Sequence, residues 1–419
     1  MHAQPSAPDR GFRLSQLIYD TRYRSLTIQV VVFILMMATA WWLIDNTVKN
    51  LANMGKNIDF SFLWNRAGYD IAQTLIPYTN DDTHFRASVV GLLNTLLVAV
   101  LGCAAATVIG ILVGVLRLSK NWIVSRLMTV YVEIFRNVPL LLWILMIYAA
   151  FTEMTPAPNA YRGENPAASM IFWDSVALTN RYTAIPTLAM TNDPGSLMLS
   201  SINVSINWAT IAFVLAIVAG FWVRALIGRW ASGVQDATGE RPATWWMSLA
   251  ITVLPLIALA WFFGLHMEFP ELKGFNFTGG INVLNSLVAL WLALSLYTSA
   301  FIAEIVRAGI MSVSKGQTEA AFALGLRPGR TMSLVILPQA LRVIIPPLIS
   351  QYLNLTKNSS LAIAVGYLEL RGTLGGITLN QTGRELEAVL LMMLTYLAIS
   401  LTISSAMNIY NNRVKLKER

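Results

Sequence analysis

Five stretches of this chain are long enough to cross a lipid bilayer and contain no Asp, Glu, Lys or Arg. A transmembrane helix needs about 20 apolar residues, and a sixth stretch without charge, 25–44, also reaches that length. Because these stretches are continuously apolar and do not alternate, helices are favoured over a β-barrel. Only 12% of the 419 residues are charged, about half the usual share in a soluble domain. The five stretches are 87–116, 194–223, 242–267, 274–303 and 388–412.

The hydropathy pattern predicts an all-α membrane protein with about eight transmembrane helices. If both termini lie in the cytoplasm, 19 of the 30 basic residues fall in cytoplasmic segments and 9 in external ones. This bias follows the positive-inside rule. The net charge of +8 is therefore explained by membrane orientation, and nucleic acid is not expected as a partner. The expected spans are 26–45, 88–116, 125–151, 208–223, 246–266, 281–306, 342–366 and 388–409.

The first apolar stretch has two interpretations. Arg22 and Arg24 precede it, and Ala38-Thr39-Ala40 resembles the cleavage site of a secretory signal. However, the stretch is longer than a typical signal core, and Trp41-Trp42 follow it as in an interfacial belt. An uncleaved anchor at 26–45 is favoured. The single cysteine, Cys103, allows no disulfide within the chain and no metal site of the cysteine type.

The second span carries small residues at every fourth position, Gly102, Ala106, Gly110 and Gly114. Such a stripe lets another helix approach closely, so we expect a packing face. The polar segments 46–87 and 152–207 are predicted to be external loops with short helical pieces. Several prolines in the second of these segments argue against a long helix.

The third and seventh spans are predicted to be interrupted. Glu133, Arg136 and Pro139 break the third, and Pro346-Pro347 and Lys357 break the seventh. An ionisable side chain at mid-membrane costs at least ~2.5 kcal/mol and usually faces a partner or a watery cavity. Paired interrupted spans in a transporter indicate the translocation site. The predicted substrate path offers cations to the carboxylate of an amino acid and polar groups to the rest of that molecule. It consists of Arg136, Asn137, Thr298, Lys357, Ser359 and Ser360.

Two simpler interpretations of these charges stay open. Glu133 and Arg136 stand three residues apart and could pair with each other on one helix face. Lys357 could extend its ammonium group to the outer interface.

The segment between the sixth and seventh spans predicts a compact helix–turn–helix. Glu319, Ala320 and Ala321 form helices well. Gly325 is expected to end the first helix, and Arg327-Pro328-Gly329 to turn the chain. A second short piece runs to Pro338 and re-enters the membrane. By composition alone, an ordinary amphipathic re-entry loop is favoured.

The spacing within this segment resembles a known family. Glu-Ala-Ala, three residues, Gly, nine residues and a hydrophobic-x-Leu-Pro sequence are similar to the coupling loop of type I ATP-binding-cassette importer permeases. Val335 stands where that family usually has Ile, and Asn358-Ser359 where it commonly has Asp-Thr. Further segments resemble its polar amino-acid branch: 90–96, 135–141, 303–310, 316–317, 337–340 and 355–361. Spans four and five and the segment 152–207 look like an insertion, and a long permease of this shape resembles the general L-amino-acid transporters of the Aap and Bzt type.

The resemblance implies a transport subunit, not an enzyme, in the bacterial inner membrane. It implies that a partner binds ATP and Mg, and the chain has no Gly-x-x-x-x-Gly-Lys-[Ser/Thr] phosphate loop. No cofactor and no metal site are expected in this chain. The implied partners are a cassette ATPase dimer, a second and shorter homologous permease in a heterodimer, a periplasmic solute-binding protein and membrane lipid. The residues that this resemblance assigns to ATPase coupling are Gly316, Glu319, Ala320, Ala321, Gly325 and Arg327.

The resemblance also divides the chain into a five-helix permease core and additional segments. We expect a tail (1–25), an extra anchor (26–45), an external loop (46–87), a first core segment (88–151), an insertion with a transmembrane hairpin (152–280), a second core segment (281–409) with the coupling loop 311–340, and a tail (410–419).

Two other classes remain as alternatives. An ion-coupled secondary transporter of small polar solutes would not need the Glu319 loop, and would usually show inverted repeats, which are not evident. A membrane-embedded enzyme would need clustered catalytic groups, yet His2, His84 and His266 are scattered along the chain.

Overall fold

The computed structural model describes residues 21–53, 55, 57–163, 166–199 and 204–414, and it divides into two units, 1–62 and 63–419. The first unit contains α2 (Thr21–Asn53). Apolar side chains along α2 are exposed on all sides, as expected of a helix that faces lipid. The predicted span 26–45 is therefore confirmed as a helix. The ends of the two predicted tails, 1–20 and 415–419, lie outside the described residues.

Seven of the described helices are long and apolar enough to cross a membrane, or eight if one sharply bent pair counts as a single span. The predicted number of about eight is confirmed. The second unit contains α3 (His84–Leu116), α4 (Trp122–Asn137), α5 (Leu140–Met154), α6 (Trp208–Thr238), α7 (Trp245–Phe262), α8 (Asn285–Met311), α9 (Lys315–Ala323), α10 (Pro328–Thr331), α11 (Leu337–Asn358), α12 (Leu370–Gly372), α13 (Leu379–Thr382) and α14 (Glu385–Val414).

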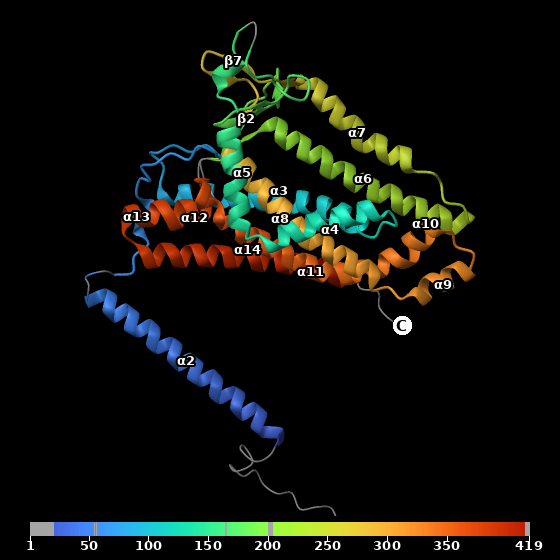
Figure 1. The fold of residues 1–419 in the computed structure, drawn as a ribbon, viewed down its shortest axis with the longest axis horizontal. Coiled ribbons are helices and arrows are strands. Elements are labelled where there is room, and N and C mark those ends of the chain that lie inside the picture. The colour runs from blue at the N-terminus through green and yellow to red at the C-terminus, as the bar shows by residue number, and fades with distance from the viewer. Residues whose placement is uncertain (1–20, 54, 56, 164–165, 200–203, 415–419) are drawn as a thin grey trace, which may run out of the picture. The chain divides into compact units, whose positions relative to one another are not determined.

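Helix α8 is the centre of the second unit, and α3, α5 and α11 pack against it (Figure 1). The stripe of small residues predicted on α3 is buried. A β carbon at Gly102 would meet Leu355 of α11, and one at Gly114 would meet Ala303 and Val306 of α8. The prediction of a packing face is confirmed: α3 and α8 approach closely because these positions have little or no side chain.

The predicted third span, 125–151, is not one helix. α4 and α5 meet at an angle of 104°. Val138 between them is extended, at φ −105° and ψ 133°, and Pro139 follows it. The physical cause is local, since a residue before proline is driven out of the helical region and proline offers no backbone donor.

The expectation that Pro346-Pro347 interrupt the seventh span is wrong. α11 runs through both prolines, whose rings lie on its exposed side. The regular helix instead ends at Asn358, where the 3₁₀ segment η4 (Ser359–Val365) begins. Gly366, at φ 70°, ends η4. The π-helical turn η3 (Met332–Ile336) joins α10 to α11, so the second piece of the predicted loop is continuous with the span.

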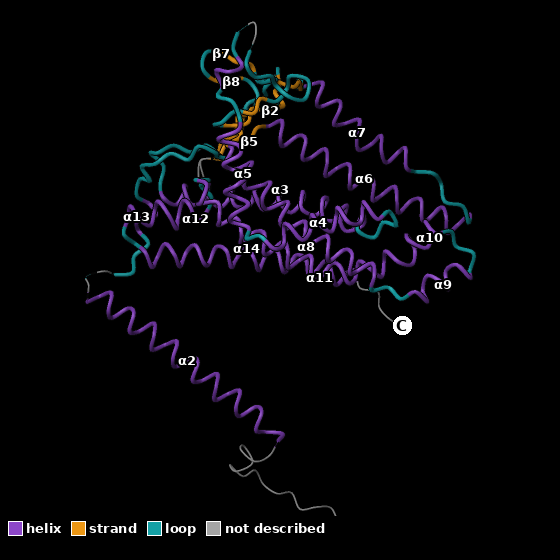
Figure 2. The backbone as a smooth tube through the Cα atoms, in the orientation of Figure 1, coloured by secondary structure: helices purple, strands orange, loops and turns teal. Residues whose placement is uncertain are grey.

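The segment 152–207 was predicted to be a loop with short helical pieces, and its described residues contain one such piece, the 3₁₀ turn η2 (Pro158–Tyr161). The residues that flank α6 and α7 were not predicted to be strands. They form antiparallel strands, and Figure 2 shows these strands gathered beside α5. One sheet has the order β1-β2-β9, and the pairs β3-β6, β4-β5 and β7-β8 are separate. Within the described residues the strands are β1 (Ala177–Leu178), β2 (Tyr182–Ile185), β3 (Thr187–Met190), β4 (Ser196–Leu199), β5 (Val204–Asn207), β6 (Leu265–Glu268), β7 (Glu271–Lys273), β8 (Asn276–Thr278) and β9 (Ile281–Leu284).

Helices α6 and α7 form a hairpin that packs mainly on itself and on the neighbouring strands β5 and β6. In α7, which is described throughout, no side chain is buried. α6 extends to Thr238, well beyond the predicted end at 223. Its 31 residues span about 46 Å, which exceeds the ~30 Å hydrocarbon layer, so its polar last turns continue past the apolar part.

Candidate functional site

The predicted helix–turn–helix exists as α9 and α10. α9 ends in a glycine cap, in which the amide of Leu326 donates to the carbonyl of Ala321 (3.1 Å) and that of Gly325 donates to the carbonyl of Phe322 (2.9 Å). Gly325 has φ 77°, a left-handed conformation that strains any residue with a β carbon. The sequence prediction that Gly325 ends the first helix is confirmed. We call α9 and α10 with their connection (315–331) the coupling hairpin.

The coupling hairpin presents most of the residues that the resemblance assigned to ATPase docking. Gly316, Glu319 and Ala320 are exposed, as are Gly325 and Arg327. Ala321 is buried and anchors α9 to the rest of the unit.

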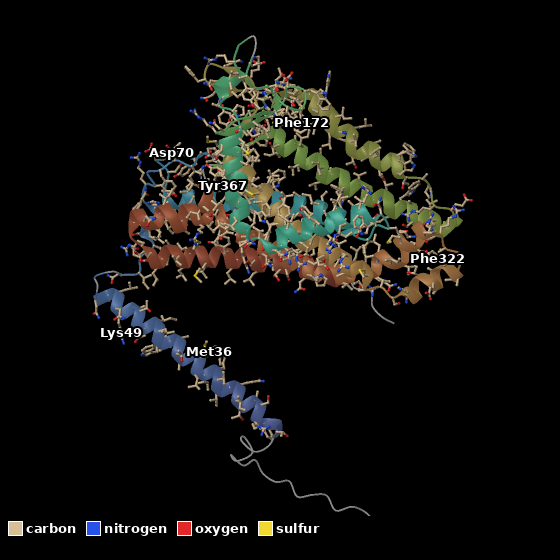
Figure 3. The ribbon with its side chains drawn as sticks, viewed as in Figure 1. Met36, Lys49, Asp70, Phe172, Phe322 and Tyr367 are labelled. Carbon is tan, nitrogen blue, oxygen red and sulfur yellow. The ribbon has the colours of Figure 1, made fainter. Side chains whose placement is uncertain are left out.

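Two apolar side chains are also exposed on the coupling hairpin: Phe322, labelled in Figure 3, and Leu324. Leu324 is 82% exposed. A charged residue beside exposed apolar side chains on a slim, capped turn is a suitable surface for docking another protein.

An ion-paired cluster joins α3 to α8 near the coupling hairpin. The carboxylate of Glu304 pairs with the guanidinium groups of Arg117 and Arg307, the second at 2.6 Å. Arg117 is nearly buried, and its partner stands on the other helix. This cluster holds the ends of α3 and α8 together just before the chain enters α9.

A cavity of about 210 Å³ lies among the ends of α11 and α12 and the middle of α14. Two cations line it, Lys357 in the last turn of α11 and Arg371 in α12. Within the described part of the chain, no carboxylate lies within 4.0 Å of either charge. A cavity with two cations and no acid of its own can take an anionic group. We call it the dicationic cavity; its lining is Lys357, Ser360, Arg371, Met392 and Tyr396.

The structure brings two residues of the predicted substrate path, Lys357 and Ser360, to the dicationic cavity. Two others are not part of the lining. Thr298 is buried within α8, and Ser359 is buried behind the lining, where it contacts Tyr396 and donates to the carbonyl of Thr356.

Arg136 and Asn137 also lie away from the lining of this cavity. The guanidinium group of Arg136 stands 5.4 Å from the centroid of the Phe301 ring, a cation–π arrangement. Asn137 donates to Glu133 at 3.1 Å. The helix-face pairing of Glu133 with Arg136, considered as an alternative, is therefore not the arrangement seen in the structure.

Three lining residues were not predicted: Arg371, Met392 and Tyr396. Arg371 could have been recognised from the sequence, because Glu369 and Arg371 are the only two charged residues between Lys357 and Arg384. An isolated acid and base in an otherwise uncharged stretch indicate a buried or cavity-facing role. The two residues on α14 had no local signal, since only the tertiary fold turns them toward Lys357.

Comparison with known proteins identifies the family. The family described as "Binding-protein-dependent transport system inner membrane component" matches residues 212–416, a range that begins inside α6. The glutamate/glutamine/aspartate/asparagine transport system permease protein BztB of Rhodobacter capsulatus is 62% identical over 98% of both chains. The general L-amino acid transport system permease protein AapQ of Rhizobium johnstonii is 44% identical over 98% of this chain and 96% of its own length.

Shorter relatives match only a portion of the chain. The probable glutamine ABC transporter permease protein GlnM of Bacillus subtilis is 36% identical over 46% of this chain and 88% of its own length. The ion-coupled alternative is not favoured, because the matching family consists of inner-membrane components of binding-protein-dependent transport systems and both full-length relatives are transport-system permeases. The chain therefore belongs to the permease family of binding-protein-dependent, type I ATP-binding-cassette importers, in the general L-amino-acid branch.

Proposed function

We propose that this chain forms one side of a translocation path for polar amino acids, with the dicationic cavity as its substrate site. Permeases of this family are transport subunits of the inner membrane, and they work with a separate ATPase and a solute-binding protein. The observation that carries the proposal is the pair of cations, Lys357 and Arg371, that share one cavity without an acidic partner among the described residues.

The depth of the cavity suits a translocation site. Tyr396 lies eleven residues after the start of α14 at Glu385. At 1.5 Å per residue this is about 16 Å along the helix, roughly half of the ~30 Å hydrocarbon layer. A cation at this depth is costly unless it meets water or an anion, and an amino-acid carboxylate supplies that anion during transport.

The chemistry of the lining favours amino acids with polar side chains. Lys357 and Arg371 together can hold two carboxylate groups or one carboxylate and one amide oxygen. BztB, the relative with 62% identity, is named for glutamate, glutamine, aspartate and asparagine. These substrates carry such pairs of groups.

The coupling hairpin is proposed to dock into the cassette ATPase dimer, which binds ATP and Mg. Its exposed Glu319 supplies a charge, and Phe322 and Leu324 supply apolar contact. No cofactor is assigned to this chain. Because α9 follows α8 after three residues, movement of the ATPase would be passed to the central helix of the core.

A second permease is proposed to complete the path, as a heterodimer with a shorter homologue. Lys357 and Arg371 are exposed at the surface of the second unit, so the cavity is open on one side. The shorter relatives show that about half of this chain corresponds to nearly a whole permease. Such a homologue could therefore close the cavity without a counterpart of α2 or of the α6–α7 hairpin.

The test is uptake of labelled L-glutamate and L-glutamine by cells that depend on this importer. Arg371→Met and Lys357→Met should each lower uptake of both by at least about tenfold, since each removes a charge-assisted contact. The level of inserted protein and the basal ATP hydrolysis of the purified complex should stay unchanged. Lys273→Met, which removes an exposed cation on β7 outside the cavity, is the matched control.

Two outcomes would overturn the proposal. Normal uptake by both cavity variants at normal protein level would remove the cavity from the path. Normal function of this chain without any second permease homologue would refute the heterodimer.

A further inference from the structure

Glu369 is a fully buried carboxylate beside the dicationic cavity. It lies in the segment between η4 and α12, and its side chain has 0% exposure. Tyr367, two residues earlier and also fully buried, marks this segment within the helices in Figure 3. Removing a carboxylate from water costs several kcal/mol unless donors surround it. The hydrogen-bond donors around Glu369 therefore indicate the role of its side chain.

One carboxylate oxygen fixes the turn that carries Arg371. Oε1 of Glu369 accepts from the amide of Gly372 at 2.9 Å and so caps α12. α12 has three residues, too few to form a stable turn alone. The backbone of Leu370 is also held, because its amide donates to Oγ1 of Thr95 at 3.1 Å.

The other carboxylate oxygen holds Tyr396. The hydroxyl of Tyr396 donates to Oε2 of Glu369 at 2.7 Å, and Oγ1 of Thr95 stands 3.4 Å from the same oxygen. Within the described residues, no side-chain nitrogen of Lys or Arg lies within 4.0 Å of this carboxylate. The side chain of Glu369 is therefore not paired with the guanidinium group of Arg371, which stays available to the cavity.

The direction of the Tyr396 hydrogen bond determines which ligand groups its hydroxyl can bind in the cavity. A phenol has one proton, and the hydroxyl of Tyr396 donates it to Oε2 of Glu369. Toward any other partner, the hydroxyl oxygen of Tyr396 can only accept. The carboxylate behind it makes that oxygen a stronger acceptor, because linked hydrogen bonds polarise one another at low dielectric.

We propose that Tyr396, polarised by Glu369, is the acceptor that binds the ammonium group of the amino acid in the dicationic cavity. Lys357 and Arg371 take the carboxylates of the same molecule. Glu369 is a positioning residue, acting through Tyr396 and the turn of Arg371. This inference rests on the proposed function, since it requires the cavity to be the substrate site. It assigns to Tyr396 the distinction between an amino acid, which has an ammonium group, and a dicarboxylate that has none.

The experiment compares two ligands that differ in the ammonium group. L-glutamate and glutarate both carry two carboxylates, and only the first has an ammonium group. Their affinities are measured by calorimetry on the purified importer complex without its solute-binding protein, so that only the membrane-embedded subunits select. The wild type should bind L-glutamate at least about tenfold more tightly than glutarate, the value of one charge-assisted hydrogen bond.

Tyr396→Phe should bring this ratio close to one by weakening L-glutamate binding and leaving glutarate binding unchanged. Glu369→Gln should lower the ratio in the same direction, because an amide has one acceptor oxygen and cannot satisfy the donors at both carboxylate oxygens. Asn94→Ala is the matched structural control. Asn94 is equally buried and bonds the backbone of the same segment at Leu368 (2.8 Å), and it is not among the residues that line the cavity. It should lower the melting temperature and keep the ratio.

The outcomes separate this inference from the proposed function. If Tyr396→Phe folds and keeps the wild-type ratio, the ammonium role is overturned, while loss of both ligands in Arg371→Met would still support the cavity. If wild-type complex binds neither ligand, both proposals fall. If Asn94→Ala changes the ratio as Tyr396→Phe does, the effect is structural and the inference fails.

Discussion

Gly110 of α3 lies so close to Ile302 of α8 that a β carbon at position 110 would stand 2.6 Å from the β carbon of Ile302. The carbonyl oxygen of Ser299 would be 3.0 Å away. Both neighbours belong to the rigid face of a buried helix, so neither can move aside cheaply. The contact makes the spacing of α3 and α8 depend on the absence of one methyl group.

We therefore expect Gly110→Val to separate the two helices and to destabilise the permease by about 1–3 kcal/mol, the usual cost of overpacking. The measurement is the melting temperature of the detergent-purified protein. Gly228→Ala is the matched control, because Gly228 lies in helix α6 and a β carbon there would meet nothing within 4 Å. An unchanged melting temperature for Gly110→Val would show that the α3–α8 contact is not as tight as described.

Reversing the charge of Glu319 should uncouple the permease from its ATPase. Glu319→Lys places the opposite charge on the exposed face of the coupling hairpin, and like charges at an interface cost several kcal/mol. We expect uptake to be abolished and copurification of the ATPase to fall, with protein level unchanged. Glu240→Lys, an exposed acid just after α6, should behave as the wild type. Wild-type uptake by stable Glu319→Lys protein would disprove the docking role.

Orientation can be tested with single cysteines in a background where Cys103 is replaced by alanine. A cysteine at exposed Ser312, just after α8, should be labelled by a membrane-impermeant reagent only in inside-out vesicles. A cysteine at Trp173, which is 97% exposed, should be labelled only in intact cells with a permeable outer membrane. The reverse pattern would overturn the assignment of both termini to the cytoplasm.

Arg136 and Lys357, both predicted for the substrate path, should behave differently. Lys357→Met should weaken L-glutamate binding to the purified complex at least about tenfold, as a residue of the dicationic cavity. Arg136→Met should keep that affinity and lose only the contact with Phe301, worth about 0.5–1 kcal/mol. Equal losses of affinity in the two variants would instead place Arg136 on the path.

Local sequence signals predicted the coupling hairpin and the small-residue stripe correctly. Gly325 could be recognised as a helix end because a left-handed cap needs glycine. The stripe from Gly102 to Gly114 could be recognised because its period matches one face of a helix. In both cases the residues that decide the structure are close together in the chain.

The sheet and the cavity lining were missed because they depend on residues that are far apart in the chain. β2 pairs with β9, with Tyr182 opposite Leu284, about a hundred residues away, so no local pattern marks that sheet. The lining residue Tyr396 is brought to Lys357 only by the packing of α14 against α11. The prolines of α11 were expected to break it, yet a transmembrane helix tolerates proline where the freed backbone groups find other partners.

Helix α8 has one further consequence. At its start, Asn285 is 1% exposed, donates to the carbonyl of Thr179 at 2.6 Å and accepts from the hydroxyl of Thr183, which fastens it to the β1-β2-β9 sheet. At its other end the chain passes directly into α9. Its 27 residues make a strut of about 40 Å. A force applied to the sheet is therefore transmitted along a single stiff helix to the α9 side of the second unit. An antibody fragment bound to the sheet should alter the rate of ATP turnover without touching the ATPase.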